Sequence, residues 1–218
     1  MRDTEPTPSA FDAAYTRSAP LFGVAMSRDL RDYLDEHPAV GSALDLGCGD
    51  GRDTMHLLRR GFHVTAVDRS PSAIAALTAR GDISASMRAL LTATQADVRT
   101  WAWPRATFDL VVATTLLDHL PADDLAPVVA RMAAAAKADA LIFVQVHTTD
   151  DPAVTGDGSK SEFAREIRHY FGPNELLDAF RAHVRVLKYE ERTEWDAEHG
   201  APHAHGFAVL LGRVKPRG

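Results

Sequence analysis

A short glycine-rich stretch constrains the fold of this chain more than any other feature. Residues 43–54 read Ala-Leu-Asp-Leu-Gly-Cys-Gly-Asp-Gly-Arg-Asp-Thr, and Met55, Leu57 and Leu58 then open a helical pattern. An apolar strand, a tight turn and a helix in this order are typical of the first unit of an open α/β sheet. Glycines leave room for a ligand against the backbone, and the helix N-terminus offers free N–H groups at the same place. The stretch therefore predicts a nucleotide-type site.

The details of this turn argue against two common nucleotide sites. The dinucleotide pattern G-x-G-x-x-G needs a third glycine where this chain has Arg52, and the phosphate-binding pattern G-x-x-x-x-G-K-[ST] is absent from the sequence. An acid, Asp45, precedes the first glycine, Gly47, by two residues. A carboxylate at a strand end suits a cationic group such as an α-ammonium better than a pyrophosphate. A NAD-dependent oxidoreductase is therefore kept only as an alternative.

Length and composition predict one decorated α/β domain. The chain has 218 residues, of which 45% are hydrophobic and 25% charged, as in ordinary globular proteins. Residues 1–10 are rich in Pro, Ser and Thr and are expected to be a disordered tail. We expect residues 11–38 to form an N-terminal helical segment and residues 39–218 to form the main domain.

The net charge and the cysteine content indicate which binding partners and which cellular compartment to expect. The net charge of −6 argues against a nucleic-acid or anionic-membrane surface, and no apolar run is long enough to span a membrane. The single cysteine, Cys48, cannot form an internal disulfide, and the N-terminus lacks the apolar region of a signal peptide. We therefore expect a cytoplasmic monomer or homodimer that acts on a small molecule, with neither nucleic acid nor a membrane as partner.

A second acid follows the next strand. The β-branched run 63–67 ends at Asp68, about twenty residues beyond the first acid. In a doubly wound sheet the tips of the first two strands are neighbours, so a carboxylate there can accept hydrogen bonds from both hydroxyls of a ribose. Further strands are expected at 91–95, 108–113, 141–146, 184–191 and 207–213, with Val184, Val186 and Leu187 buried, and helices at 51–60, from Ser70-Pro71, and at 122–137.

Histidines gather between the last two expected strands. The segment reads Asp-Ala-Glu-His-Gly-Ala-Pro-His-Ala-His over residues 196–205. On an extended chain His203 and His205 share one face, and His199 lies across the Gly-Ala-Pro turn. These imidazoles are expected to contact the substrate or to act as a general base. Two alternatives stay open, which are a transition-metal site made by the three histidines and an exposed hairpin without function.

The motifs resemble those of a known family. Residues 45–51 match D/E-x-G-x-G-x-G, the first motif of class I methyltransferases that use S-adenosylmethionine. The pattern [D/N/S]-P-P-[Y/F], which marks methylation of nucleobase or glutamine amino groups, does not follow the expected strand 108–113. Tyr170-Phe171-x-x-x-Glu175-Leu176, the run 186–191 and the His-rich segment before Phe207-Ala208 resemble the tellurite-resistance type, which is related more distantly to thiopurine methyltransferases.

The resemblance implies a fold and a reaction. The fold is a Rossmann-like, seven-stranded, mostly parallel sheet with helices on both faces and an antiparallel last strand. The reaction is SN2 transfer of the methyl group of S-adenosylmethionine to a small-molecule acceptor, with S-adenosylhomocysteine as product. Residues 11–38 are expected to act as a lid over the donor. A non-catalytic domain that binds S-adenosylmethionine remains a second alternative.

The resemblance also implies the site residues. The expected donor-binding residues are Asp45, Gly47, Gly49, Gly51, Asp68, Arg69, Asp97, Val98, Ala113 and Leu117. Asp97 and Val98 would contact the adenine, and Leu117 would lie near the sulfonium. The expected catalytic residues are His119, His203 and His205, and the expected substrate contacts are Tyr15, Arg17, Tyr170, His199 and His203. An oxygen or nitrogen nucleophile would need a base, whereas an anionic sulfur, selenium or tellurium nucleophile would not.

Overall fold

The computed structural model describes residues 10–17, 21, 23–155, 163–196 and 202–216. The expected disordered tail, apart from Ala10, and His199 lie outside the described residues. None of the described helices is long and apolar enough to cross a membrane. The helices and strands are α1 (Ala10–Arg17), α2 (Arg28–Glu36), β1 (Ser42–Leu46), α3 (Arg52–Arg59), β2 (His63–Asp68), α4 (Pro71–Ala79), α5 (Ala85–Ala89), β3 (Leu91–Gln95), β4 (Phe108–Thr114), η1 (Leu117–His119), α6 (Ala122–Ala135), β5 (Ala136–His147), α7 (Pro152–Thr155), η2 (Ala164–Glu166), α8 (Glu175–Phe180), β6 (Val184–Asp196) and β7 (His203–Val214).

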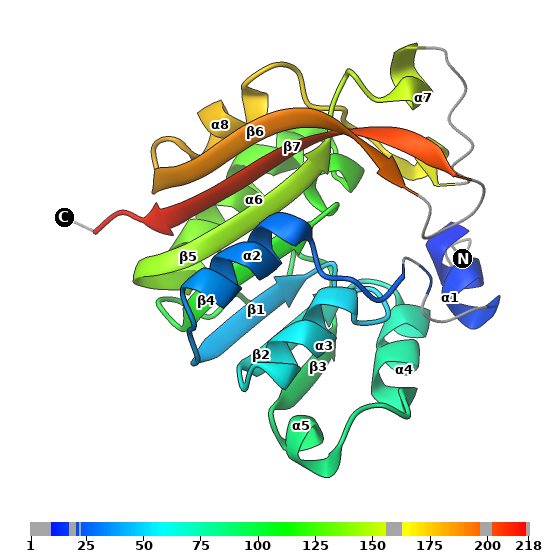
Figure 1. Ribbon diagram of the computed structural model, residues 1–218, viewed down its shortest axis with the longest axis vertical. Helices are drawn as coiled ribbons and strands as arrows, with labels where there is room; N and C mark the ends of the chain where they lie inside the picture. The colour runs from blue at the N-terminus through cyan, green and yellow to red at the C-terminus, as the bar shows by residue number, and fades with distance from the viewer. Residues whose placement is uncertain (1–9, 18–20, 22, 156–162, 197–201, 217–218) are drawn as a thin grey trace, which may run out of the picture.

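The strands of the described chain form one seven-stranded sheet in the order β3-β2-β1-β4-β5-β7-β6 (Figure 1). β1 pairs in parallel with both β2 and β4, and the parallel pairing continues to β3 on one side and β5 on the other. β7 runs antiparallel to both of its neighbours, β5 and β6. The expected Rossmann-like fold with an antiparallel last strand is therefore confirmed.

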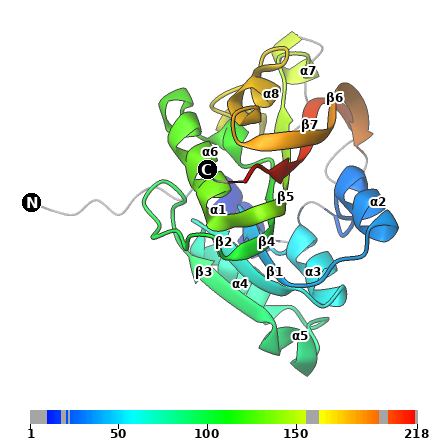
Figure 2. The ribbon, with the colours of Figure 1, turned by 90° about the vertical axis from the view of Figure 1, so that its left-hand side faces the viewer.

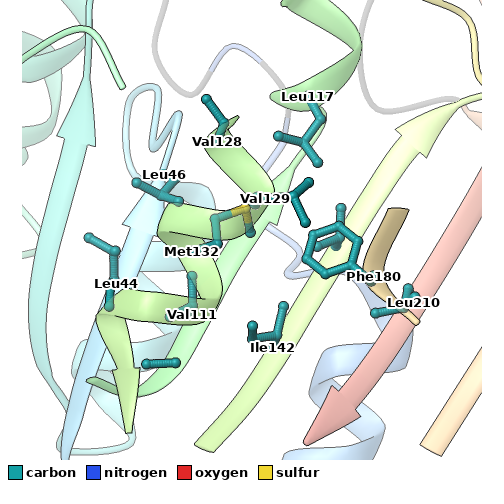
Figure 3. Packing of buried hydrophobic residues seen from close by; sticks show 14 of the residues in the cluster. Leu44, Leu46, Val111, Leu117, Val128, Val129, Met132, Ile142, Phe180 and Leu210 are labelled. Carbon is teal, nitrogen blue, oxygen red and sulfur yellow. The ribbon is translucent and has the colours of Figure 1, made fainter. Parts of the chain in front are cut away.

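Helices cover both faces of the sheet because successive strand side chains point to opposite faces. Leu44 and Leu46 of β1 pack in one apolar cluster with residues of α6 and α8, whereas Ala43 packs in a second cluster with residues of α2, α3 and α4. Figure 2 shows α6 and α8 on one side of the sheet and α2 and α3 on the other. In the first cluster, Figure 3 shows Val129 and Met132 of α6 lying over the sheet.

The C-terminal strands are longer than the sequence pattern predicts. β6 and β7 stay paired from Val184 and Val214 to Asp196 and His203, so the expected hairpin containing His203 is part of a strand. β5 likewise begins at Ala136. The charged residues of β6 hide its strand pattern, because β6 is an edge strand with one pairing partner and much of it faces solvent.

The expected burial of two residues of β6 is wrong. Val186 is 36% exposed and Leu187 is 38% exposed, whereas Val184 is buried. The register with β7 shifts between Val186 and Lys188, so the alternation of buried and exposed side chains is interrupted there.

The N-terminal helical segment divides into two parts. α1 lies at the carboxyl edge of the parallel strands, and α2 packs on the sheet through Leu30 and Leu34 (Figure 1). The buried carboxylate of Asp29 in α2 accepts hydrogen bonds from Lys188 Nζ at 2.5 Å and from Arg192 Nη2 at 2.5 Å, both on β6. This ionic contact anchors α2 to the edge of the sheet, and the lid role remains a prediction for α1.

Asp29→Ala should lower the free energy of unfolding by about 2–3 kcal/mol, because Arg192 is left largely buried with one partner fewer. Burial opposes ionisation of Asp29, but the hydrogen bonds from Lys188 and Arg192 prevail and lower its pKa. The folded-state pKa then lies below the unfolded one, so this stabilisation is present above about pH 4 and is lost as the pH falls further. Urea denaturation from pH 7 to pH 3 measures both effects. Asp32→Ala, which removes a largely exposed partner of Arg31, is the control and should change stability by less than about 0.5 kcal/mol.

Candidate functional site

A cavity of about 560 Å³ opens at the carboxyl ends of the parallel strands. Its wall contains the turn after β1, the tips of β2, β4 and β5, the first helix and part of β7. The chain leaves β1 toward one face of the sheet and leaves β4 toward the other, which is where open α/β sheets bind ligands. The volume lies within the range of small-molecule sites.

The glycine turn after β1 has the backbone conformation that only glycine adopts easily. Gly47, Gly49 and Gly51 have φ values of 67°, 54° and 95°. A Cβ atom on Gly49 would lie 2.6 Å from the hydroxyl oxygen of Tyr15. The turn therefore presents bare backbone to the cavity, as the sequence predicts.

Asp45 is a buried carboxyl group at the start of this turn. It accepts a hydrogen bond of 2.6 Å from Thr54 Oγ1 and is 2% exposed. Burial and the neighbouring Asp53 carboxylate raise the pKa of Asp45 to about 7. A cationic group beside Asp45 would lower its pKa again, so this wall of the cavity favours a positively charged ligand.

Asp68 at the tip of β2 is held by backbone amides. Its Oδ2 accepts from Gly49 N at 2.9 Å and its Oδ1 accepts from Ser70 N at 2.8 Å. Burial raises the pKa of Asp68, although these two amides oppose the shift. Each carboxylate oxygen keeps a further lone pair, so the oriented group can accept two hydroxyl donors.

The predicted adenine contacts lie on the cavity wall together with Arg69. The carboxylate of Asp97 accepts from Arg99 Nη2 at 2.6 Å, and this bond lowers the pKa of Asp97 against the effect of burial. The carbonyl of the buried Val98 accepts from Trp103 Nε1 at 2.8 Å. The adenine role of Asp97 and Val98 stays a prediction.

Two predicted donor contacts lie elsewhere. The side chains of Ala113 and Leu117 are fully buried in the apolar cluster under α6. In the described part of the wall, the same region is formed by Thr114, Thr115 and Leu116. Side chains alternate between the two faces of a strand, so Thr114 faces away from the side that holds Ala113. The turn after β4 starts with Thr115 at a φ of 50°, and this turn directs Thr115 and Leu116 toward the cavity in place of Leu117.

The first helix forms one side of the cavity. The ring of Phe11 stacks on Phe163 at 4.8 Å and meets His119 edge-on at 5.1 Å. Asp12 is hydrogen-bonded to the hydroxyl of Ser70 at the start of α4. Among the predicted substrate contacts, Tyr15 and Tyr170 line the cavity, while the side chain of Arg17 lies outside what the structure describes.

The predicted catalytic histidines separate into two groups. His119 and His205 belong to the cavity wall, whereas His203 is absent from its described residues. His203 and His205 are 6% and 5% exposed, so the alternative of an exposed hairpin is wrong for both. The physical reason is that β7 begins at His203, which draws both side chains into the packed end of the sheet.

A buried His–Asp group lies beside these residues, and no sequence pattern predicted it. His147 Nδ1 is 2.5 Å from Asp118 Oδ2, and His205 Nδ1 is 3.0 Å from Asp151 Oδ2. His147 directly follows the expected strand 141–146, so its place at a strand tip was a usable signal. Nothing local in the sequence indicates that Asp118 or Asp151 would meet a histidine.

Asp45→Asn should raise the free energy of unfolding at pH 8 by about 1–3 kcal/mol when no ligand is bound. The folded-state pKa of Asp45 lies above the unfolded one, so the native state binds more protons between about pH 4 and pH 7. The contribution of Asp45 to stability therefore falls as the pH rises through that window, and asparagine removes this penalty. Urea denaturation at pH 4 and pH 8 measures the difference, which should be small at pH 4. Asp109→Asn is the control of opposite sign, because Lys137 lowers the pKa of Asp109 against the effect of burial.

Comparisons with known proteins identify part of the chain. Residues 43–139 match a family described as "Methyltransferase domain". Hemagglutinin 1 of Eikenella corrodens is 31% identical over 150 residues, covering 68% of this chain and 45% of that protein. Trans-aconitate 2-methyltransferase of Mycobacterium tuberculosis is 36% identical over 95 residues, covering 38% of this chain and 33% of that protein. The chain thus spans less than half the length of these curated relatives.

A solved structure extends the likeness to the fold. The crystal structure of TehB from Haemophilus influenzae aligns with a TM-score of 0.69 over 87% of this chain and 63% of that chain, at 21% identity. At this identity the likeness shows a shared fold, and because it covers 87% of the chain it extends into the part beyond residue 139. Residues 43–139 thus carry a methyltransferase domain, and the glycine motif and the strand order agree with the class I S-adenosylmethionine-dependent methyltransferases.

Proposed function

We propose that the protein transfers the methyl group of S-adenosylmethionine to a small-molecule acceptor and releases S-adenosylhomocysteine. The observation that carries the proposal is the buried Asp45 carboxyl, whose raised pKa marks a place that favours a positive charge. One relative's name, trans-aconitate 2-methyltransferase, supports a small acceptor. The dinucleotide alternative is disfavoured, because Arg52 occupies the third glycine position.

The cavity residues fit the donor part by part. Asp45 would accept hydrogen bonds from the ammonium of the methionine portion, and the bare turn at Gly47 and Gly49 would lie against it. Asp68 would accept both ribose hydroxyls, and Asp97 with the Val98 backbone would contact the adenine. When bound, the donor supplies a methyl group already activated on a sulfonium. The remaining task of the protein is to align the acceptor and to exclude water.

Side chains from distant parts of the chain would exclude water. Phe11 and Tyr15 of α1 close one side of the cavity, and the stacking of Phe11 on Phe163 joins α1 to the segment that follows α7. Burial and the Asp68 and Asp50 carboxylates raise the pKa of Tyr15, so its hydroxyl stays protonated. We propose that α1 is the lid over the donor and that Tyr170 contacts the acceptor.

His119 is the proposed general base for a hydroxyl or amine acceptor. Its Nδ1 lies 3.0 Å from the carbonyl oxygen of Glu166. A carbonyl oxygen only accepts, so Nδ1 donates in this bond and leaves Nε2 as the nitrogen that can accept a proton. His205 belongs instead to the buried His–Asp group, and His203 lies off the described wall.

The setting of the reaction follows from the charge of the chain and the size of the cavity. The net charge of −6 and the small-molecule size of the cavity support a protein that acts on a small acceptor without nucleic acid or a membrane. We propose a monomer or homodimer in the cytoplasm.

Binding of S-adenosylhomocysteine tests the donor assignment directly. Calorimetry with the full chain should show one site for S-adenosylhomocysteine and no heat with NADH. Asp68→Asn should weaken binding at least about tenfold, because an amide group replaces one acceptor oxygen and cannot serve both ribose hydroxyls. Asp82→Asn, a largely exposed carboxylate paired with Arg80, is the control and should leave the Kd unchanged. Binding of NADH, or an unchanged Kd in Asp68→Asn, would refute the assignment.

His119→Gln should lower kcat about 100-fold for hydroxyl and amine acceptors and leave the Kd of S-adenosylhomocysteine within twofold. Labelled S-adenosylmethionine with a panel of hydroxyl, amine, thiol and oxidised selenium acceptors provides the assay. Anionic sulfur or selenium acceptors should react equally fast with both proteins, because they carry no proton at the attacking atom. The exposed His63→Gln is the control. Equal losses with every acceptor would show that His119 positions groups rather than accepting a proton.

A further inference from the structure

A compact group of metal-binding side chains lies at the end of the cavity formed by β5 and β7. His147, Asp151 and His205 are 8%, 1% and 5% exposed, and one ligand atom from each lies within 4.8 Å of the others. All three residues belong to the cavity wall. We propose that His147, Asp151 and His205 bind one divalent transition-metal ion of the Zn²⁺ class.

The fold holds these three residues in place. His147 is the last residue of β5 and is the register partner of Phe207 on β7, two residues beyond His205. The two imidazole rings lie 5.0 Å apart at an interplanar angle of 71°. Neighbouring strands of one sheet therefore supply both histidines, and such strand positions are more rigid than loops.

Gly206 brings the carboxylate to the two histidines. A Cβ atom on Gly206 would lie 2.6 Å from the backbone nitrogen of Asp151, so glycine permits the turn after β5 to pack directly on β7. Gly206 N donates to Asp151 Oδ2 at 3.1 Å, and Thr148 N donates to Gly206 O at 2.9 Å. The bond from Gly206 N and a second one from Ala153 N to Asp151 Oδ1 at 2.8 Å fix the Asp151 carboxylate, whose oxygens keep lone pairs for a metal ion.

The chemistry of the donor set favours Zn²⁺ or a similar ion. Two imidazoles and one carboxylate form catalytic zinc sites and the open sites of non-haem iron. In a tetrahedral site with bonds of about 2.1 Å the ligand atoms lie about 3.4 Å apart, so small side-chain rotations would complete the shell. The Asp118 carboxylate at His147 Nδ1 matches the outer carboxylate that commonly orients a metal-binding histidine.

This set of three ligands differs from the three histidines that the sequence suggested, and it suggests a role for the metal ion in the reaction. Of the three histidines that the sequence suggested for a metal, only His205 belongs to it among the described residues. Three protein ligands leave a coordination position open toward the cavity, where an acceptor oxygen, nitrogen or sulfur would bind and lose its proton more easily. Binding of the metal itself does not depend on the proposed methyl transfer.

The test uses the tag-free full chain, stripped with EDTA and dialysed. Addition of Co²⁺ should produce visible d–d bands that saturate at one equivalent, and Zn²⁺ should displace them. His147→Ala and His205→Ala should each weaken Zn²⁺ binding at least about 100-fold, and Asp118→Asn about tenfold or more, because it disturbs the orientation of His147. His119→Ala, which removes a cavity histidine outside the group, should leave metal affinity unchanged.

Two outcomes would overturn the metal site. One is a wild-type chain with no Co²⁺ bands and no retained Zn²⁺ by elemental analysis. The other is an unchanged Zn²⁺ affinity in both His147→Ala and His205→Ala. The affinity for S-adenosylhomocysteine and the midpoint of thermal unfolding show whether each variant is folded. A loss of metal binding is attributed to the removed side chain only where both are retained. Asp151→Asn, which preserves the shape of the side chain, is the second variant if an alanine variant fails to fold.

Discussion

β1 pairs in parallel with β2 and with β4, and the rest of the molecule depends on this central position. A parallel pair needs a crossover connection, and the crossovers beside β1 run over opposite faces of the sheet. The two connections diverge at the carboxyl edge and leave the cavity between them. The turn after β1, Asp68 at the tip of β2 and His147 at the tip of β5 meet there because parallel strands end at one edge.

The end of the cavity that Asp45 and Asp68 line is destabilising in the absence of a ligand. Asp45 is buried and Asp68 is half-buried, and burial raises the pKa of each carboxyl. The Thr54 hydroxyl and the amides of Gly49 and Ser70 satisfy their oxygens without supplying a positive charge. A site of this kind is pre-organised for an ammonium group and for hydroxyl donors, and it is destabilising until they arrive. The apolar clusters on the two faces of the sheet provide the stability that offsets this cost.

The end of the cavity beside β5 and β7 depends on the antiparallel strands. β7 enters between β5 and β6, so His205 comes beside His147 although the two residues are far apart in the chain. β6 in turn receives the buried Asp29 carboxylate from α2. The N-terminal segment therefore contributes twice, since α2 supports the edge of the sheet and α1 forms one side of the cavity.

The sequence by itself determined the fold class and the glycine turn and carboxylates that line one end of the cavity. The motif from Asp45 to Gly51 is contiguous, each strand carries its own apolar pattern, and Asp68 follows a strand directly, so local residues carry these predictions. Tertiary structure alone decided the meeting of His147, Asp151 and His205, the placement of Ala113 and Leu117 in the core, and the strand conformation of His203. The physical reason is the distance along the chain between the residues that meet. The periodicity of one segment shows which of its side chains face the neighbouring layer. Contacts between distant strands depend instead on their register and on close approach, such as that of Gly206 to the turn after β5, and no single segment carries this information.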